Sequence, residues 1–313
     1  MTGEPILLVA LDSDAGAPDA EAIAAAEAGL ATLPCPTVGL DTGSTRSRAT
    51  PLRDHFDVVV SSHEELEPIL LATRRRPVAA MALVQLLRQS AGLDIHQGLI
   101  AESLVYSTLQ SGPEFGEWLS ARPAAPTHEP SLEPPVLLHR SDARLELTLN
   151  RPEKRNAFSA QMRDALVEGL RTAACDPSIT EVVLRGAGPA FCSGGDLDEF
   201  GTLPDPATAH AVRSTRNPGR LLAHCADRLR AELHGACVGA GIELAAFARQ
   251  VTASKDSFFQ LPEVAMGLVP GAGGTVSIPR RIGRQRTGYL ALSGLSVDAP
   301  TAHRWGLIDE IRA

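Results

Sequence analysis

The stretch GACVGAGIELAAFA (residues 235–248) combines a short apolar run, a glycine-rich turn and the start of a probable helix around one acidic residue, Glu243. The stretch FFQLPEVAMGLVPGAGG (258–274) repeats this composition around Glu263. An isolated buried carboxylate is costly, so it is normally neutralised, hydrogen-bonded or kept for chemistry. For either glutamate alone, a capping or salt-bridged carboxylate is the ordinary explanation.

Segments with strand and helix patterns alternate on the N-terminal side of these stretches. ARLELTLN (143–150) alternates as a strand does, and residues 151–176 begin with a turn and continue as an amphipathic helix. TEVVLRGAG (180–188) is a strand that runs into a glycine turn. This alternation predicts an α/β fold with crossover connections.

Two glycine-rich loops are suited to presenting backbone N–H groups. They are PAFCSGGDLDEF (189–200) and HGACVGAGIE (234–243). The second fails the dinucleotide fingerprint G-x-G-x-x-G because Leu244 holds the last position, and PGAGGT (270–275) lacks the lysine of a P-loop. Two N–H donors can stabilise an enolate, and two carboxylates can manage a water and a proton. We interpret the nearby residues Cys192, Cys237 and His234 as packing residues.

Composition narrows the class of protein. The chain has 313 residues, 44% of them hydrophobic but only 4% aromatic, which predicts a large aliphatic core. A net charge of −8 argues against nucleic acid as a partner. No apolar run approaches the roughly 20 residues that span a bilayer, and the N-terminus does not resemble a signal peptide. The five scattered cysteines form no C-x-x-C pair, so we expect a reduced cytoplasmic protein without a metal site.

A proline-rich linker over residues 121–137 divides the chain into two predicted parts. Residues 1–120 are expected to form a small α/β domain of unknown role, with no catalytic constellation, and residues 138–313 the catalytic core. The elements expected in the first part are strands at 5–11 and 57–62 and helices at 17–33, 79–90 and 96–109.

Five segments of the second part resemble the crotonase (enoyl-CoA hydratase/isomerase) superfamily. They occur in the family's order across 144–311, and read LTLNRPEKRNAFSAQM, GAGPAFCSGGDLDEF, HGACVGAGIELA, FFQLPEVAMGLVPGAGGT and HRWGLIDEI. The resemblance implies a crotonase-like spiral of ββα units, here preceded by the small α/β domain. It also implies a coenzyme A thioester as substrate, with no other cofactor.

The resemblance also implies roles for individual residues. The backbone N–H groups of Ser193 and Ala240 would hold the thioester oxygen. Glu243 and Glu263 would orient water and transfer the α-proton. The path of coenzyme A would be lined by Arg155, Asn156, Ala157, Gly195, Asp196 and Leu197.

Both glutamates together favour an enoyl-CoA hydratase that works through an oxyanion-stabilised enolate. Isomerisation, thioester hydrolysis, C–C bond cleavage and acyl-CoA binding without turnover are the alternatives. The family also implies a homo-oligomer, a trimer or hexamer, and no membrane partner. Its members usually continue into further C-terminal helices, and we expect the helices within 79–109 to cover the site in their place. Ala240 stands where the family usually has glycine. If this position required a positive φ, alanine would be disfavoured there.

Overall fold

The computed structural model describes residues 4–11, 19–43, 51–123, 133–202 and 205–312. The larger of its two C-terminal sheets has six strands, which are parallel except for the antiparallel pair β4–β5. In spatial order the strands are β12 (Glu310–Arg312), β9 (Gln250–Ser254), β7 (Leu229–Leu233), β6 (Glu181–Gly186), β5 (Arg144–Leu149) and β4 (Val136–Ser141).

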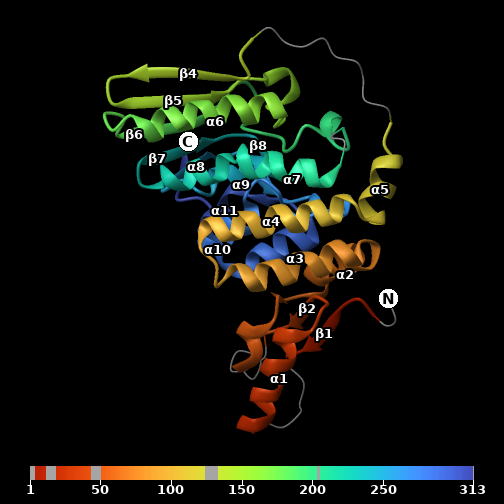
Figure 1. Cartoon of the computed structure of the whole chain (residues 1–313). Coiled ribbons are helices and arrows are strands. Elements are labelled where there is room, and N and C mark those ends of the chain that lie inside the picture. The colour runs from red at the N-terminus through yellow and green to blue at the C-terminus, as the bar shows by residue number, and fades with distance from the viewer. Residues whose placement is uncertain (1–3, 12–18, 44–50, 124–132, 203–204, 313) are drawn as a thin grey trace.

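The strand patterns explain which faces of this sheet are buried. Leu145, Leu147 and Leu149 alternate with less buried residues along β5, whereas the run Val182–Leu184 in β6 is completely buried. A continuous apolar run is typical of a parallel strand covered on both faces. Helix α6 (Ala160–Cys175) contacts β4 and β5 and lies beside them in Figure 1.

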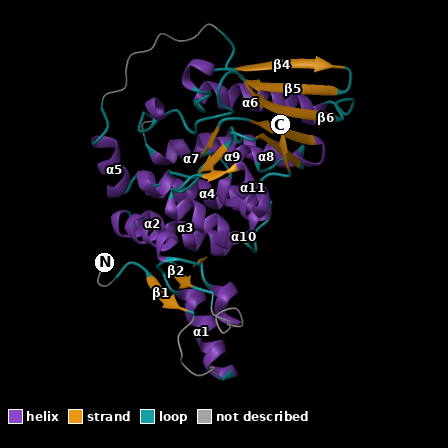
Figure 2. Cartoon of the chain, turned by 180° about the vertical axis from the view of Figure 1, so that it is seen from behind, coloured by secondary structure: helices purple, strands orange, loops and turns teal. Residues whose placement is uncertain are grey.

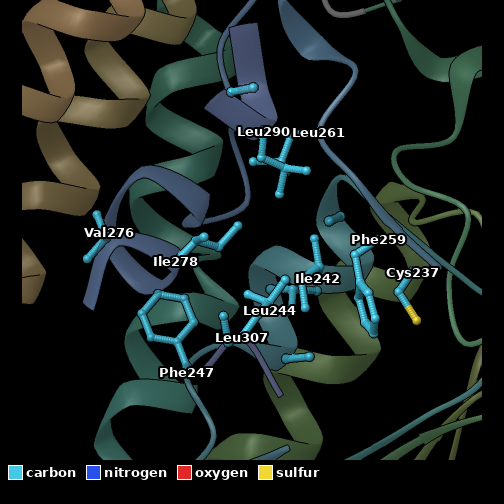
Figure 3. Packing of buried hydrophobic residues seen from close by; sticks show 14 of the residues in the cluster. Cys237, Ile242, Leu244, Phe247, Phe259, Leu261, Val276, Ile278, Leu290 and Leu307 are labelled. Carbon is cyan, nitrogen blue, oxygen red and sulfur yellow. The ribbon is translucent and has the colours of Figure 1, made fainter. Parts of the chain in front are cut away.

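A second sheet carries the two stretches that contain the glutamates. It has three strands in the order β11 (Val297–Asp298), β10 (Phe258–Gln260) and β8 (Ala236–Val238). Around it lie the helices α9 (Ala240–Ala245), α10 (Gly274–Ser293) and α11 (Ala299–Trp305). Figure 3 shows the aliphatic core here, where Leu244 and Phe259 gather with Ile278 of α10.

The segment that connects β6 to β7 of the larger sheet forms short helices. They are α7 (Pro206–Thr215) and α8 (Pro218–His224), each begun by a proline in the first turn and capped by Asp205 or Asn217. Helix α8 contacts α6, and α7 contacts α4. This segment therefore links the larger sheet to helices from the N-terminal part of the chain.

The first part of the chain begins with a parallel three-stranded sheet. Its strands are β1 (Leu7–Ala10), β2 (Thr37–Leu40) and β3 (Val58–Val60), accompanied by α1 (Ala20–Thr32). This unit stands at the lower end of the molecule in Figure 1 and is seen from behind in Figure 2. A small cluster of Leu11, Leu30 and Phe56 fills it. Asp57 ties it to α10 through an ion pair of 2.7 Å with Arg284.

Four further helices of the first part pack on the C-terminal half. They are α2 (His63–Arg75), α3 (Pro77–Ser90), α4 (Ile95–Gln110) and α5 (Pro113–Ser120). Helix α10 contacts α2, α3 and α4. A Cβ on Gly98 of α4 would lie only 2.9 Å from Val276 of α10, so glycine permits this close approach. One continuous hydrophobic core therefore includes residues before and after the proline-rich segment.

The local sequence also fixes where α4 begins. Asp94 accepts a hydrogen bond from the Gln97 backbone N–H (2.8 Å), and the Gln97 side chain accepts one from the Asp94 N–H (3.2 Å). This reciprocal capping satisfies two helix donors that would otherwise lack partners. It sets the register that places residue 102 on the face packed against the C-terminal half.

The predicted α/β fold is confirmed, and so are strands β1 and β3 and helices α1, α3 and α4. Strand β2 and helices α2 and α5 were not predicted. Strand β4 begins at Val136, within the range expected for the linker, and residues 124–132 of that linker lie outside the described residues. In the part of the chain that is described, no helix is long and apolar enough to cross a membrane.

Candidate active site

One pocket brings together both glutamates and both glycine-rich loops. Gly195, Ala240, Glu243 and Glu263 all line it. A second group of lining residues comes from α4, and comprises Leu99, Glu102, Ser103, Tyr106 and Gln110. The α7–α8 segment adds Arg213, Arg216, Asn217 and Pro218. The first part of the chain therefore forms one wall of the pocket through α4, whereas α3, the other helix expected within 79–109 to cover the site, does not line it.

Glu243 is oriented by the turn that precedes α10. It lies in the first turn of α9 and is only 2% exposed. Its Oε2 atom accepts hydrogen bonds from the backbone N–H groups of Ala272 (2.7 Å) and Gly274 (2.9 Å). These two bonds fix the carboxyl group in one orientation at the pocket wall.

Glu263 has a different environment at the start of the short 3-10 helix η6 (Glu263–Met266). Its Oε2 atom is buried and has no hydrogen-bond partner among the described residues. Gly239, with φ of 49°, makes room for this carboxyl group, because a Cβ there would lie 2.4 Å from Glu263 Oε1. A buried carboxyl oxygen without a donor is better tolerated when the group is protonated.

A third carboxylate, Glu102 of α4, holds the same turn from the opposite side. Glu102 Oε1 accepts from Gly273 N–H (2.7 Å), and Oε2 accepts from the N–H (2.9 Å) and hydroxyl (2.7 Å) of Thr275. Successive N–H groups from residue 272 to residue 275 thus alternate between Glu243 and Glu102. A carboxylate from each part of the chain fixes this turn.

The three carboxyl groups have raised pKa values, and burial is the main cause for each. The pKa of Glu102 rises to about 7 and that of Glu263 to about 8. The pKa of Glu243 is raised well above its usual value by burial and by the negative charges of Glu263 and Glu102, although the N–H groups of the turn oppose the rise. The pocket thus favours holding a proton on at least one carboxyl group near neutral pH.

The donors available for an oxyanion differ in part from the expected pair. The Ser193 N–H donates to the Arg155 carbonyl oxygen (3.0 Å), and Ser193 does not line the pocket. The structure therefore does not support Ser193 as a donor. Gly195 does line it, and its N–H has no partner among the described residues because the pairing with Phe158 uses the N–H of Asp196 instead.

Ala240 is placed as expected and without backbone strain. Its N–H, at the first position of α9, has no partner among the described residues, and the residue lines the pocket. The non-glycine residues with positive φ in the described ranges are Asp142, Arg155 and Asn156. The preceding Gly239 takes the positive φ, so an alanine is accommodated at 240.

The residues expected along the coenzyme A path form a closely bonded turn and loop. Arg155 and Asn156 adopt left-handed φ values of 50° and 55°. The buried Asn156 side chain accepts from Arg151 N–H (2.8 Å) and donates to the carbonyl groups of Ala187 and Ala190 (2.8 Å each). The Ala157 N–H donates to the Lys154 carbonyl oxygen (3.0 Å). The Asn156 side chain therefore shapes the loop, while Arg155 is exposed beside it.

Asp196 and Leu197 join this loop to its neighbours. The nearly buried Asp196 carboxylate pairs with the Arg151 guanidinium (2.8 Å) and accepts from Asp198 N–H (3.2 Å). Leu197 is exposed, and its carbonyl oxygen accepts a hydrogen bond from Arg122, which follows α5. Asp196 lines the pocket together with Gly195. The side chains of Asp196 and Asn156 are both committed to internal partners.

The cysteines and histidine near the loops have structural positions. Cys192 and Cys237 are fully buried and form a β-bridge with one another through their backbones. Burial raises the pKa of both thiols, which disfavours a nucleophilic thiolate. His234 Nε2 lies 2.9 Å from the Gly188 carbonyl oxygen. These positions agree with the packing roles inferred for all three residues.

Sequence reasoning missed Glu102, Tyr106 and Arg213, which all line the pocket. The signal for Glu102 was present, because GLIAESLVYSTL is another mainly apolar helix with a single glutamate. The criterion applied to Glu243 and Glu263 would have selected it. Glu102 was not predicted at the site because residues 1–120 were expected to form a separate domain without catalytic residues.

Comparison with known proteins shows the family of the chain. The family described as enoyl-CoA hydratase/isomerase matches residues 140–313. The chain is 36% identical to 1,2-epoxyphenylacetyl-CoA isomerase of Escherichia coli strain K12, over 56% of this chain and 69% of that protein. It is also 36% identical to 2,3-dehydroadipyl-CoA hydratase of the same organism, over 56% and 68% of the two chains.

Solved structures give the same result for the fold. The crystal structure of an enoyl-CoA hydratase from Mycobacterium smegmatis matches with a TM-score of 0.54 and 32% identity, over 58% of this chain and 71% of that one. An enoyl-CoA hydratase from Thermoplasma volcanium matches with a TM-score of 0.52 and 32% identity, over 57% and 72%. The expected crotonase-like fold is therefore confirmed, and the chain belongs to the enoyl-CoA hydratase/isomerase family.

Proposed function

We propose that the protein adds water across the 2,3-double bond of an acyl-CoA thioester. The observation that carries this proposal is the meeting of Glu243 and Glu263 in one pocket with the unpaired N–H groups of Gly195 and Ala240. Two carboxyl groups suit a reaction that must both activate a water and deliver a proton. Two unpaired N–H donors that line one pocket suit the negative charge that develops on a thioester oxygen.

The proposed reaction places one role on each group. The N–H groups of Gly195 and Ala240 donate to the thioester oxygen. Glu243 accepts a proton from water as the water oxygen bonds to C3, and the electron pair of the double bond moves toward the thioester to give the enolate. Glu263 then gives its proton to C2, and the enolate collapses to the 3-hydroxyacyl thioester. Proton exchange with solvent restores both carboxyl groups.

The hydrogen bonds explain this division of roles. Burial and the charges of Glu263 and Glu102 raise the pKa of Glu243, but two backbone N–H bonds oppose this rise and stabilise its ionised form, and we assign it the proton-accepting role on these bonds. Glu263 Oε2 has no donor among the described residues, and the pKa of Glu263 is raised to about 8. Glu263 is therefore protonated at neutral pH and available as the acid. Different environments give two carboxyl groups opposite tasks.

The first test is the hydration of crotonyl-CoA by the purified protein. Loss of the conjugated thioester's ultraviolet absorbance, with a product heavier by one water, would support the proposal. A rise in absorbance with a 3-enoyl-CoA would instead support isomerisation. Release of free coenzyme A would support thioester hydrolysis, and binding without any product would support an acyl-CoA-binding protein.

Replacement of Glu243 by glutamine separates hydration from isomerisation. We expect kcat for hydration to fall about 100-fold, because glutamine cannot accept the proton of water. The side-chain amide also places an N–H group in a site built to accept from Ala272 and Gly274. The measurement is steady-state hydration, with folding checked by circular dichroism. Undiminished turnover in Glu243→Gln would contradict the assigned role.

Replacement of Glu102 by glutamine tests whether the first part of the chain supports the chemistry. The change replaces one of the two oxygens that accept from Gly273 and Thr275 by an NH2 donor, and it removes a negative charge that raises the pKa of Glu243 and Glu263. We expect a 10- to 100-fold lower kcat, the effect of leaving buried donors unpaired. We also expect the alkaline limb of the kcat–pH profile to move to lower pH.

The charged and titratable groups near Glu102 are Glu243, Glu263, Arg213 and Tyr106. A purely structural effect of Glu102→Gln would lower kcat and the melting temperature without moving the alkaline limb. Ser90→Ala, which removes a buried hydroxyl bonded only within α3, is a control for general loosening of the helical layer. An unmoved pH profile would overturn the electrostatic role of Glu102.

A further inference from the structure

The pocket contains a positively charged side chain that the proposed reaction does not use. Arg213 of α7 lines the pocket, and its guanidinium lies 4.6 Å from the centre of the Tyr106 ring. Nε donates to Ser103 Oγ (3.1 Å), and Nη2 donates to Gln110 Oε1 (3.3 Å) and to Ser107 Oγ. These neutral acceptors on α4 fix its orientation and leave its charge uncompensated.

Several other arginines of low exposure in the described residues pair with a carboxylate, whereas the half-buried Arg228, which does not line the pocket, donates to the carbonyl oxygens of Ile179 and Ala173. Arg151 pairs with Asp196 (2.8 Å), and Arg281 pairs with Asp309 (2.6 Å). Arg163 and Arg216, which line the same pocket, pair with Asp164 and Glu168. No carboxylate of the described residues lies within 4 Å of Arg213.

The remaining ionisable neighbours do not satisfy Arg213 either. Burial raises the pKa of Tyr106 above its usual range, so its hydroxyl is neutral. Glu102 is attracted to Arg213 at longer range, but its two oxygens already accept three hydrogen bonds from Gly273 and Thr275. Nη1 of Arg213 has no partner among the described residues. A partly buried guanidinium with this surplus charge is complementary to a ligand anion.

The position of Arg213 indicates which part of a thioester could supply that anion. The thioester oxygen would lie at Gly195 and Ala240, and the reacting carbons beside Glu243 and Glu263. Arg213 contacts α4 at Ser103, Ser107 and Gln110, so its guanidinium is centred near Ser107, which lies roughly 7–8 Å along the helix axis from Glu102 at 1.5 Å per residue. A charge at the far end of a short acyl chain would reach this position.

We propose that the pocket takes 2-enoyl-CoA thioesters whose acyl chain ends in a carboxylate, and that Arg213 binds this carboxylate. The substrate class rests on the proposed hydration, whereas the recognition of the carboxylate is a separate property of the pocket. A guanidinium can bind a carboxylate through two parallel hydrogen bonds, which gives orientation as well as affinity. An uncharged chain of the same length would leave the buried charge unpaired.

The test compares five- and six-carbon trans-2-enoyl-CoA thioesters that end in a carboxylate with those that end in a methyl group. We expect kcat/KM to favour the carboxylates about 10- to 100-fold, in line with one charge-assisted contact. In Arg213→Met this preference should fall to near unity. Arg213→Lys should keep part of it. Arg220→Met, on exposed α8 surface outside the pocket, should keep the wild-type preference.

Calorimetry with saturated thioesters separates this proposal from the proposed reaction. Tighter binding of the carboxylated thioester that is lost in Arg213→Met would support the subsite even if no hydration occurs. Equal binding of both chains by the wild type would overturn the subsite while leaving hydration intact. If Arg213→Met weakened the binding of free coenzyme A as much as the binding of the thioesters, Arg213 would bind the phosphates. This result would also overturn the proposal.

Discussion

Replacing Glu263 with glutamine is expected to lower kcat for enoyl-CoA hydration by a factor of about 10² to 10⁴, the usual contribution of a general acid. Glutamine keeps the size of the side chain and the space beside Gly239, but it has no acidic proton to give to C2. The measurement is the loss of conjugated-thioester absorbance at saturating substrate. Glu117→Gln, on the exposed surface of α5, is the matched control and should be as active as the wild type.

The same substitution should have the opposite effect on stability. The pKa of Glu263 rises from an ordinary 4.5 to about 8 in the folded protein, so the folded state loses stability as pH rises across that window. Glutamine removes this titration. The melting temperature of Glu263→Gln should therefore exceed that of the wild type by a margin that grows from pH 5 to pH 8. Retained activity, or a margin that shrinks with pH, would contradict the environment assigned to Glu263.

Deleting residues 1–120 is expected to abolish both soluble folding and activity. The deletion removes Glu102 and exposes apolar side chains of α10 that pack on the first part of the chain, such as Val276, which is fully buried beside Gly98 of α4. Exposing each such side chain to water lowers the stability of the folded state by roughly 1.5–3 kcal/mol. The free energy of unfolding of a domain is only about 5–15 kcal/mol. The loss of the packing of three helices on α10 therefore costs more than the total stability of the fold. The measurements are soluble yield, circular dichroism and hydration activity.

A cleavable version of the chain distinguishes loss of contacts from loss of covalent continuity. A protease site placed in the proline-rich segment between α5 and β4 cuts the backbone while leaving both parts present. After cleavage the two pieces should remain together on a sizing column and keep activity, because noncovalent packing joins α10 to α2, α3 and α4. A soluble, fully active product of the 1–120 deletion would rule out a role for these helices at the site.

The sequence was informative where local pattern and chemistry coincide. The alternation in β5, the apolar run of β6 and the single glutamates of 243 and 263 each followed from residue type and spacing. Strand β2 was not predicted: TVGL has only four residues, contains a glycine and follows two prolines, so it carries little strand signal of its own. Such short strands are recognised only through their neighbours, here β1 and β3.

The proposed oxyanion donor Gly195 shows the limit of sequence reasoning more sharply. Along an extended loop, successive N–H groups point to opposite sides. The Asp196 N–H donates to the Phe158 carbonyl oxygen, and the Ser193 N–H donates to the Arg155 carbonyl oxygen. The N–H of Gly195, which lines the pocket, has no partner among the described residues. Which residue is left unpaired depends on the register with a strand-like segment distant in the sequence. Composition cannot supply that register.

The alternating hydrogen bonds of the 272–275 turn have a consequence for how the chain is made. Glu102 is separated by 171 positions from Gly273, which donates to it, and by 173 from Thr275. During synthesis, helices α3 and α4 leave the ribosome long before α10 exists to cover them. Contacts of such high sequence separation form late and slow folding, and uncovered apolar helices promote aggregation in the interval. This turn of the candidate site is thus completed only when the last third of the chain has emerged and closed on its beginning.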